Sequence, residues 1–218
     1  MARRLKIKWD GGSVAARLEV PRNPQPIGLL LAHGAGAGQD HHFMEHMRRG
    51  LAGAGFTTLT FDYAYMDQGR RAPDRLPKLL AVHAAAAERL ATYADSVVLT
   101  GKSMGGRVGS HLAGDEGWPA AGLVYFGYPL VPLGKSEPRP TDHLVRIGVP
   151  QLFFAGTRDR LSPVDQVSAV VRSLPNARLE IVDGADHGFK VPKRLGVTPE
   201  EVLDQLVTAT AGWLAGSV

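Results

Sequence analysis

The chain has 218 residues, of which 44% are hydrophobic and 21% charged, and this even composition excludes a disordered protein and predicts a single domain over residues 1–218. The net charge of +4 comes from dispersed basic residues without interleaved aromatic residues, so nucleic-acid binding is not expected. Cysteine is absent, which excludes disulfides, thiolate metal sites and a cysteine nucleophile.

Membrane insertion and secretion are not predicted. The longest mostly apolar stretch, residues 120–134, contains two prolines and is too short to span a bilayer. The basic residues near the start of the chain are not followed by the apolar segment of a secretory signal. Together with the absence of cysteine, this leads us to expect a cytoplasmic protein with no membrane partner.

The predicted elements alternate between strand and helix along most of the chain. Two antiparallel strands come first, at 5–9 and 14–20, joined through Asp10-Gly11-Gly12. In chain order we then expect a strand at 27–32, a helix at 43–54, a strand at 57–61, a helix at 75–93, a strand at 97–100, a helix at 104–112, strands at 122–126 and 151–155, a helix at 162–174, a strand at 178–182 and a helix at 199–215. This order predicts an α/β fold with a mostly parallel twisted sheet and helices on both faces.

Several details of these elements are predicted from local signals. Ser162 is expected to cap the helix that Pro163 begins, and Thr198 with Glu201 forms a capping-box pattern before the last helix. The 24 residues 127–150 contain five prolines, so we expect no helical lid there and an open cleft.

The strongest chemical motif is Gly101-Lys102-Ser103-Met104-Gly105, a G-x-S-x-G pattern between a strand and a helix. Such a strand–turn–helix setting is typical of a nucleophile elbow, although an ordinary glycine-rich turn is the alternative. The turn is so tight that residues two before and two after the serine should lack a β-carbon, which Gly101 and Gly105 satisfy. Ser103 is therefore the candidate nucleophile.

A serine hydroxyl needs a base and an orienting acid. His187 lies in a glycine-flanked loop after the last strand, and Asp159 follows the strand at 151–155 directly. The resulting chain order of serine, aspartate and histidine is the order that an elbow-bearing α/β sheet predicts. Asp183 and Asp186 are rivals to Asp159 for the third position.

An acyl transfer also needs backbone donors for an oxyanion. We expect the N–H groups of Met104 and Ala35, with Gly36 as the competitor of Ala35 in the glycine-rich loop 33–38. That loop lacks the third glycine of a dinucleotide-binding G-x-G-x-x-G motif, so no cofactor is expected.

Other candidate residues carry weaker signals. Tyr63, Tyr65, Met66 and Tyr128, with Leu130, are expected to line the substrate pocket, with core packing as the alternative. Arg70, Arg71 and Lys102 are read as solvated surface charge rather than as an anion site. His42 and His46 are spaced for a metal, but we expect none, with Asp40 capping the helix there instead.

Four segments together resemble a known family: His-Gly-Ala-Gly-Ala-Gly at 33–38, Phe-Asp-Tyr-Ala-Tyr-Met at 61–66, Gly-Lys-Ser-Met-Gly-Gly-Arg at 101–107 and Gly-Thr-Arg-Asp at 156–159. They are similar to the small α/β-hydrolases of the KANL3/Tex30-like group, related to dienelactone hydrolases. The resemblance implies a serine hydrolase, whereas dienelactone hydrolases proper use a cysteine where this chain has Ser103. The expected activity is hydrolysis of small carboxylic esters or thioesters through an acyl-enzyme, by a monomer or homodimer. A non-catalytic scaffold and an acyltransferase remain alternatives.

Overall fold

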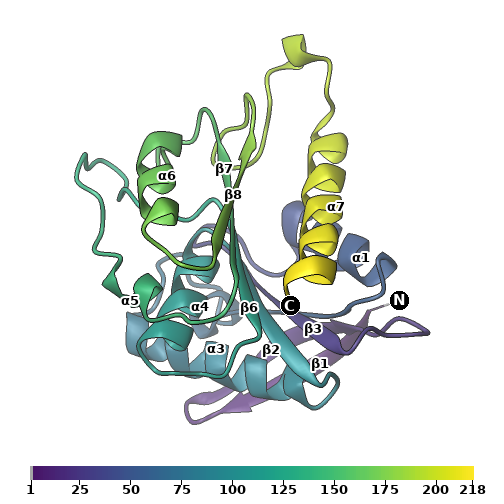
Figure 1. Ribbon diagram of the computed structural model, residues 1–218. Helices are drawn as coiled ribbons and strands as arrows, with labels where there is room; N and C mark the ends of the chain where they lie inside the picture. The colour runs from purple at the N-terminus through teal and green to yellow at the C-terminus, as the bar shows by residue number, and fades with distance from the viewer. Residues whose placement is uncertain (1) are drawn as a thin grey trace.

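Eight strands form one twisted sheet in the computed structural model, which describes residues 2–218, so that residue 1 lies outside the described part (Figure 1). Their order across the sheet is β1-β2-β4-β3-β5-β6-β7-β8. The strands are β1 (Arg3–Trp9), β2 (Gly12–Glu19), β3 (Ile27–Ala32), β4 (Thr57–Phe61), β5 (Ser96–Lys102), β6 (Gly122–Phe126), β7 (Gln151–Gly156) and β8 (Ala177–Val182).

Six of the strands run parallel, from β4 through to β8. The first two form the predicted antiparallel hairpin, and β2 then pairs antiparallel with β4. The chain leaves β3 toward β4 and later returns to β5 on the other side of β3. This reversal creates a crevice outside the carboxyl ends of β3 and β5, where ligands of open α/β sheets bind.

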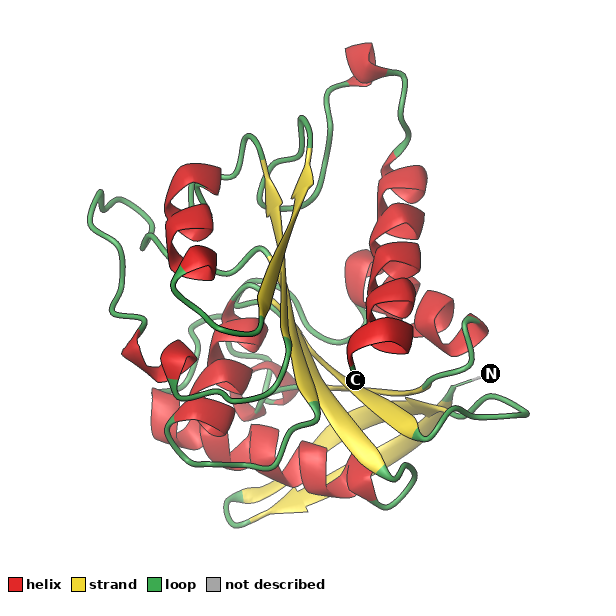
Figure 2. Cartoon of the chain, viewed as in Figure 1, coloured by secondary structure: helices red, strands yellow, loops and turns green. Residues whose placement is uncertain are grey.

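Helices cover both faces of the sheet, as predicted (Figure 2). On one face lie α1 (His42–Gly53) and α7 (Pro199–Ser217), and on the other α3 (Leu76–Ala91), α4 (Met104–Gly114) and α6 (Val164–Arg172). Strand β3 shows why both layers form: Leu29 and Leu31 belong to the core under α1 and α7, while Leu30 and Ala32 belong to the opposite core. Alternate side chains of a central strand point to opposite faces, so a fully apolar strand needs cover on both.

The segment after β6 follows the prediction of an open cleft. Within residues 127–150 the structure has only one helix, the four-residue α5 (Asp142–Val145), and it packs against α4. The described residues therefore contain no helical lid over the carboxyl ends of the strands. Among the helices of residues 2–218, none has the length and hydropathy that a bilayer crossing needs.

Two of the predicted caps are wrong, and one is confirmed. The cap position of α6 is Pro163, which has no side-chain acceptor, and the Ser162 hydroxyl is buried without a hydrogen-bond partner within residues 2–218. The cap of α1 is His41, whose ring accepts from the Phe43 N–H, while Asp40 pairs with a strand arginine. The capping box of α7, built from Thr198 and Glu201, is present. Three short elements were not predicted: α2 (Ala64–Asp67), α5 and the 3₁₀ turn η1 (Lys193–Leu195).

Candidate active site

Ser103 occupies the sharp turn between β5 and α4, at the crevice beside β3. Its backbone has φ 50° and ψ −115°, a conformation that non-glycine residues rarely adopt. A β-carbon on Gly101 would lie 2.1 Å from the Gly106 nitrogen, which explains this glycine as predicted. The reason for Gly105 differs from the prediction, because its β-carbon would meet the carbonyl oxygen of Ala32 on β3, at 2.3 Å, rather than Gly101.

The loop after β8 brings an imidazole to this serine. His187 Nε2 lies 2.8 Å from the Ser103 hydroxyl oxygen, and His187 Nδ1 lies 2.7 Å from Asp159 Oδ2. Three side chains separated by up to 84 residues in the chain are thus linked in one row of hydrogen bonds. In this row the imidazole can take a proton from the serine while the carboxylate stabilises the charge that forms.

The carboxylate of Asp159 is held by its own loop. Its Oδ1 accepts from the backbone N–H groups of Leu161, at 2.8 Å, and Ser162, at 3.1 Å, which leaves Oδ2 for the imidazole. The side chain is fully buried. The rivals lie elsewhere: Asp183 accepts from the Thr157 hydroxyl, and Asp186 accepts from backbone N–H groups in the histidine loop. Asp159 is therefore the carboxylate that contacts His187.

Gly127, directly after β6, was not singled out by the sequence. Its φ of 70° lies in the left-handed region, and a β-carbon there would approach Asp159 Oδ2 to 3.2 Å and the His187 ring to 3.4 Å. The glycine therefore leaves room for the carboxylate–imidazole pair. Its position after an apolar strand was a signal that could have been read.

The two predicted oxyanion donors flank Ser103. Met104 is the first residue of α4, so its N–H has no acceptor within the helix. Ala35 and its competitor Gly36 both line the cavity beside Ser103. The Ala35 carbonyl accepts from the Tyr65 hydroxyl at 2.9 Å, and this bond holds the peptide unit that links Ala35 to Gly36.

The buried His33 stabilises the start of the glycine-rich loop 33–38. His33 Nδ1 donates to the Gly34 carbonyl at 2.7 Å, and Nε2 accepts from the Tyr63 N–H at 3.0 Å, so the ring is neutral with one defined tautomer. Burial lowers the pKa of His33, which favours this neutral form. Sequence reasoning treated residue 33 only as part of a glycine-rich loop and missed this contact.

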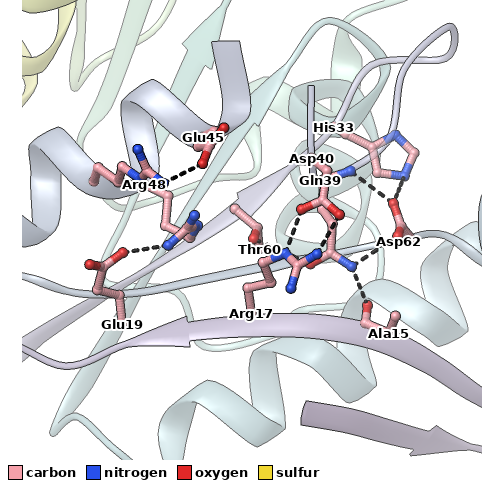
Figure 3. A network of polar contacts seen from close by, with 11 residues as sticks. Ala15, Arg17, Glu19, His33, Gln39, Asp40, Glu45, Arg48, Thr60 and Asp62 are labelled. Atoms are coloured by element: carbon pink, nitrogen blue, oxygen red, sulfur yellow. Dashed lines mark hydrogen bonds and ion pairs between the residues drawn. The ribbon is translucent and has the colours of Figure 1, made fainter. Parts of the chain in front are cut away.

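The end of that loop is anchored to the sheet by an amide and a carboxylate (Figure 3). The Gln39 side chain donates to Asp62 Oδ2 at 2.8 Å and to the Ala15 carbonyl on β2, and the Gln39 N–H donates to Asp62 Oδ1. These bonds tie the loop after β3 to β2 and to the end of β4. Loop 33–39 is therefore fixed at both ends.

A cavity of about 330 Å³ opens beside the serine. Its wall is mostly apolar and comes from the loop after β3, the start of α1, the serine turn and the histidine loop. The lining residues are Gly34, Ala35, Gly36, Ala37, His41, Phe43, Met44, Lys102, Ser103, Leu161, His187 and Gly188.

The cavity is lined by none of the five residues predicted to line the pocket, which are Tyr63, Tyr65, Met66, Tyr128 and Leu130, and this corrects that prediction. Tyr63 and Tyr65 are fully buried, Tyr128 is 2% exposed, and Met66 packs against the core. Each tyrosine hydroxyl has a partner within the fold: Tyr63 bonds to His83, Tyr65 to the Ala35 carbonyl and Tyr128 to Ser110 and His143, in the described residues. Core packing, the weaker alternative, applies instead.

The weaker polar signals also have structural explanations. His42 and His46 face Glu200 and Asp204 on α7, at 3.8 and 2.8 Å, and so link α1 to α7. Residues 2–218 contain no cluster of three or more side chains arranged to hold a metal ion. Arg70 and Arg71 are exposed, but Lys102 lines the cavity, contrary to its interpretation as surface charge.

Comparison with known proteins places this geometry in context. Residues 25–215 match the model of a family described as an alpha/beta hydrolase domain. A dienelactone hydrolase structure from Anabaena variabilis is similar, with a TM-score of 0.78, 18% identity and coverage of 100% of this chain and 98% of that chain. A serine hydrolase without a lid from Xanthomonas campestris has a TM-score of 0.71, 16% identity and coverage of 98% and 91%. A thermophilic esterase from Thermogutta terrifontis has a TM-score of 0.74, 18% identity and coverage of 98% and 98%.

Proposed function

Because this chain belongs to the alpha/beta hydrolase domain family, we propose that it is a serine hydrolase that cleaves carboxylic esters or thioesters through an acyl-enzyme. The observation that carries the proposal is the row of hydrogen bonds from Ser103 through His187 to Asp159, at 2.8 and 2.7 Å. In this proposal Ser103 is the nucleophile, His187 the general base and Asp159 the orienting carboxylate.

In the first half of the reaction, the Ser103 oxygen attacks the carbonyl carbon and its proton passes to His187 Nε2. The carbonyl oxygen becomes an oxyanion, for which the N–H groups of Met104 and Ala35 are the proposed donors. When this intermediate collapses, the bond to the alcohol or thiol breaks, and His187 returns its proton to that leaving group. The acyl group remains on Ser103 as an ester.

In the second half, water takes the place of the alcohol. His187 removes a proton from the water as it attacks the acyl carbon, and the bond to the Ser103 oxygen then breaks. The proton on His187 passes back to Ser103, and the carboxylic acid leaves. An acceptor other than water at this step would make the protein an acyltransferase with the same residues.

The cavity supports a short substrate with an apolar group. Phe43, Met44 and Leu161 offer an apolar wall of limited size beside the reacting atoms, and the cavity has about 330 Å³. With no helical lid in the described segment 127–150, a longer substituent would extend into solvent and gain little. We therefore propose esters with short acyl groups rather than long-chain lipids.

Replacement of the nucleophile tests the proposal. Ser103→Ala is expected to lower kcat on 4-nitrophenyl acetate by at least about 10⁴-fold and to abolish labelling by a fluorophosphonate. The matched control is Ser173→Ala, an exposed serine after α6, which should react as the wild type does. If wild type and Ser103→Ala are equally inactive and neither takes the label, the chain is a non-catalytic scaffold on this fold.

We also propose the subgroup of the family, the cellular compartment and the class of leaving group. The KANL3/Tex30-like group rests on the four quoted motifs, and a reducing compartment such as the cytoplasm rests on the absence of cysteine. Esters and thioesters differ in leaving group, so a matched panel of both, measured as kcat/KM, separates them.

A further inference from the structure

The residue before the nucleophile carries a charge in an unusual place. Lys102 is the last residue of β5, and its stem lines the cavity, with Cγ close to Gly34. The ammonium group turns away toward the histidine loop, where Nζ donates to the carbonyl oxygen of His187 at 2.5 Å. A charge-assisted hydrogen bond therefore joins the strand that carries the serine to the backbone of the proposed base.

Two aromatic rings lie close to the ammonium group of Lys102. Nζ lies 5.4 Å from the centre of the Phe189 ring and 5.9 Å from the centre of the Phe43 ring, and the two rings stack on each other. Both phenylalanines are buried, at 1% and 4% exposed. Within residues 2–218, no carboxylate comes within ion-pair distance of Lys102. The charge is thus held by a carbonyl and two ring faces rather than by an acid.

Such an arrangement costs stability. Burial lowers the pKa of Lys102 to about 8, against the opposing effect of Asp159 and Asp186, because the ammonium has lost much of its water. A methionine of similar length would fill the same space beside the two rings without this cost. We explain this half-buried charge by the contact that it makes with the His187 carbonyl.

Within residues 2–218, the bond from Lys102 is the hydrogen bond that joins the backbone of the histidine loop to β5, the strand that leads to the nucleophile. The loop closes on itself through Asp186, which accepts from the N–H groups of Gly188 and Lys190, and Phe189 anchors it in the core with φ 60°. These contacts fix the shape of the loop. The loop is also held to the end of β7, where the Ala185 carbonyl accepts from the Arg158 N–H at 2.9 Å. The His187 carbonyl is its contact with the end of β5.

We propose that Lys102 is a positioning residue that holds the backbone of His187 in register with the Ser103 hydroxyl. The inference rests on the proposed hydrolase function. Lys102 does not touch the reacting atoms in this proposal, and it acts through the loop that carries the base. Displacement of a reacting group by about 1 Å is enough to lower a rate by about 10²-fold.

The test compares Lys102→Met, Lys102→Arg and the control Lys190→Met, which removes an exposed charge from the same loop. For Lys102→Met we expect kcat on 4-nitrophenyl acetate to fall about 10- to 100-fold, with KM changed less than about twofold. Lys102→Arg, which keeps a donor and the charge, should recover part of kcat. Lys190→Met should match the wild type.

Two further readouts separate positioning from a structural role. The thermal midpoint of Lys102→Met should equal or exceed that of the wild type, because a buried ammonium is removed. Hydrogen exchange of the amides of residues 186–190 should accelerate in Lys102→Met and not in Lys190→Met. A lower midpoint, or unchanged loop exchange, would overturn the proposal.

A pH profile gives an independent check. Above pH about 8 Lys102 loses its proton, so kcat of the wild type should decline there, whereas Lys102→Met and Lys102→Arg should lack this decline. The ionisable groups that face Lys102 are Asp159 after β7, Asp186 and His187 after β8, and His41 before α1. The same decline in all three proteins would contradict the role of Lys102.

The remaining outcomes are also decisive. If Lys102→Met raises KM for esters with a carboxylate and leaves kcat for neutral esters unchanged, Lys102 contacts substrate and does not position the base. If the wild type neither hydrolyses esters nor takes a fluorophosphonate label, the proposed function fails. The hydrogen-exchange comparison still decides whether Lys102 holds the loop in that case.

Discussion

The hydrogen bonds of Asp159 determine which nitrogen of His187 carries the proton. Asp159 Oδ1 is occupied by two backbone N–H groups, so Oδ2 accepts from His187 Nδ1–H. The other ring nitrogen, Nε2, is then free of hydrogen and can accept from Ser103. His187 can therefore act as a base for Ser103 only while Asp159 Oδ2 accepts a hydrogen bond from Nδ1.

Replacing Asp159 Oδ2 by an amide nitrogen tests this dependence. In Asp159→Asn the retained Oδ1 keeps the two backbone bonds, and the amide group donates to His187 Nδ1. The proton then lies on Nε2, which can no longer accept from Ser103. We expect kcat to fall about 10³- to 10⁴-fold with KM nearly unchanged, measured by steady-state hydrolysis of 4-nitrophenyl acetate.

The control is Asp183, which the sequence offered as an alternative to Asp159. Asp183→Asn makes the same chemical replacement at a residue that bonds to the Thr157 hydroxyl and not to His187. Its kcat should remain that of the wild type. A large loss in Asp183→Asn, or none in Asp159→Asn, would contradict the assignment.

At the scale of elements, the end of each helix is set by a few local bonds. Helix α7 begins with a capping box: the Thr198 hydroxyl accepts from the Glu201 N–H at 3.2 Å, and the Thr198 N–H donates to the Glu201 carboxylate at 2.7 Å. Val202, Leu203 and Leu206 follow in the core under the sheet. The cap therefore fixes the start of a helix that covers one face of the sheet together with α1.

Loss of this cap should destabilise the fold by a modest amount. Thr198→Ala removes the hydroxyl acceptor and is expected to lower the free energy of unfolding by about 1 kcal/mol. The measurement is urea unfolding followed by far-ultraviolet circular dichroism. Activity at 25 °C should not change, because Thr198 is remote from the serine.

The matched control for Thr198→Ala makes the same substitution within the same helix. Thr208 is exposed in the middle of α7, where alanine has the higher helix propensity, so Thr208→Ala should raise stability by a few tenths of a kcal/mol, about 0.5 at most. Opposite signs for the two variants are expected. Equal effects would show that the cap contributes nothing.

At the scale of the whole molecule, two buried histidines link the fold to pH. Burial, with a smaller effect of His33, lowers the pKa of His83 to about 3, and burial with a smaller effect of His111 lowers the pKa of His143 to about 4. In the unfolded chain both pKa values are near 6.5. Below that pH the unfolded chain binds protons that the folded protein does not.

Stability should therefore be complete above pH 6.5 and decline as the pH falls toward the folded pKa values. At pH 5 the loss is about 2 kcal/mol for each histidine, from about 1.5 pH units at about 1.4 kcal/mol each. Urea unfolding at pH 7 and pH 5 measures it. His143→Gln should reduce the difference by about 2 kcal/mol, and His42→Gln, which replaces an exposed histidine, should leave it intact. A difference unaffected by His143→Gln would contradict this account.

Much of the architecture was determined by the sequence itself. The bounds predicted for β3, β4 and β6 are those observed, because central strands are short apolar runs bounded by turn residues. Helix starts were less accurate, as Ser162 and Asp40 show, since a side chain caps a helix only if the tertiary fold leaves it free to do so. The chain order of Ser103, Asp159 and His187 also followed from strand ends that share one edge of a parallel sheet.

Which side chains face the cavity was decided only by the tertiary structure. Tyr63, Tyr65 and Tyr128 follow strand ends as the serine does, yet each finds a polar partner inside the fold and turns away from the cavity. The direction of Lys102 likewise depends on a carbonyl 85 residues further along the chain. Sequence patterns record which residues can be buried or can react, whereas the partner that fixes a side chain comes from another element, so only the packed chain selects it.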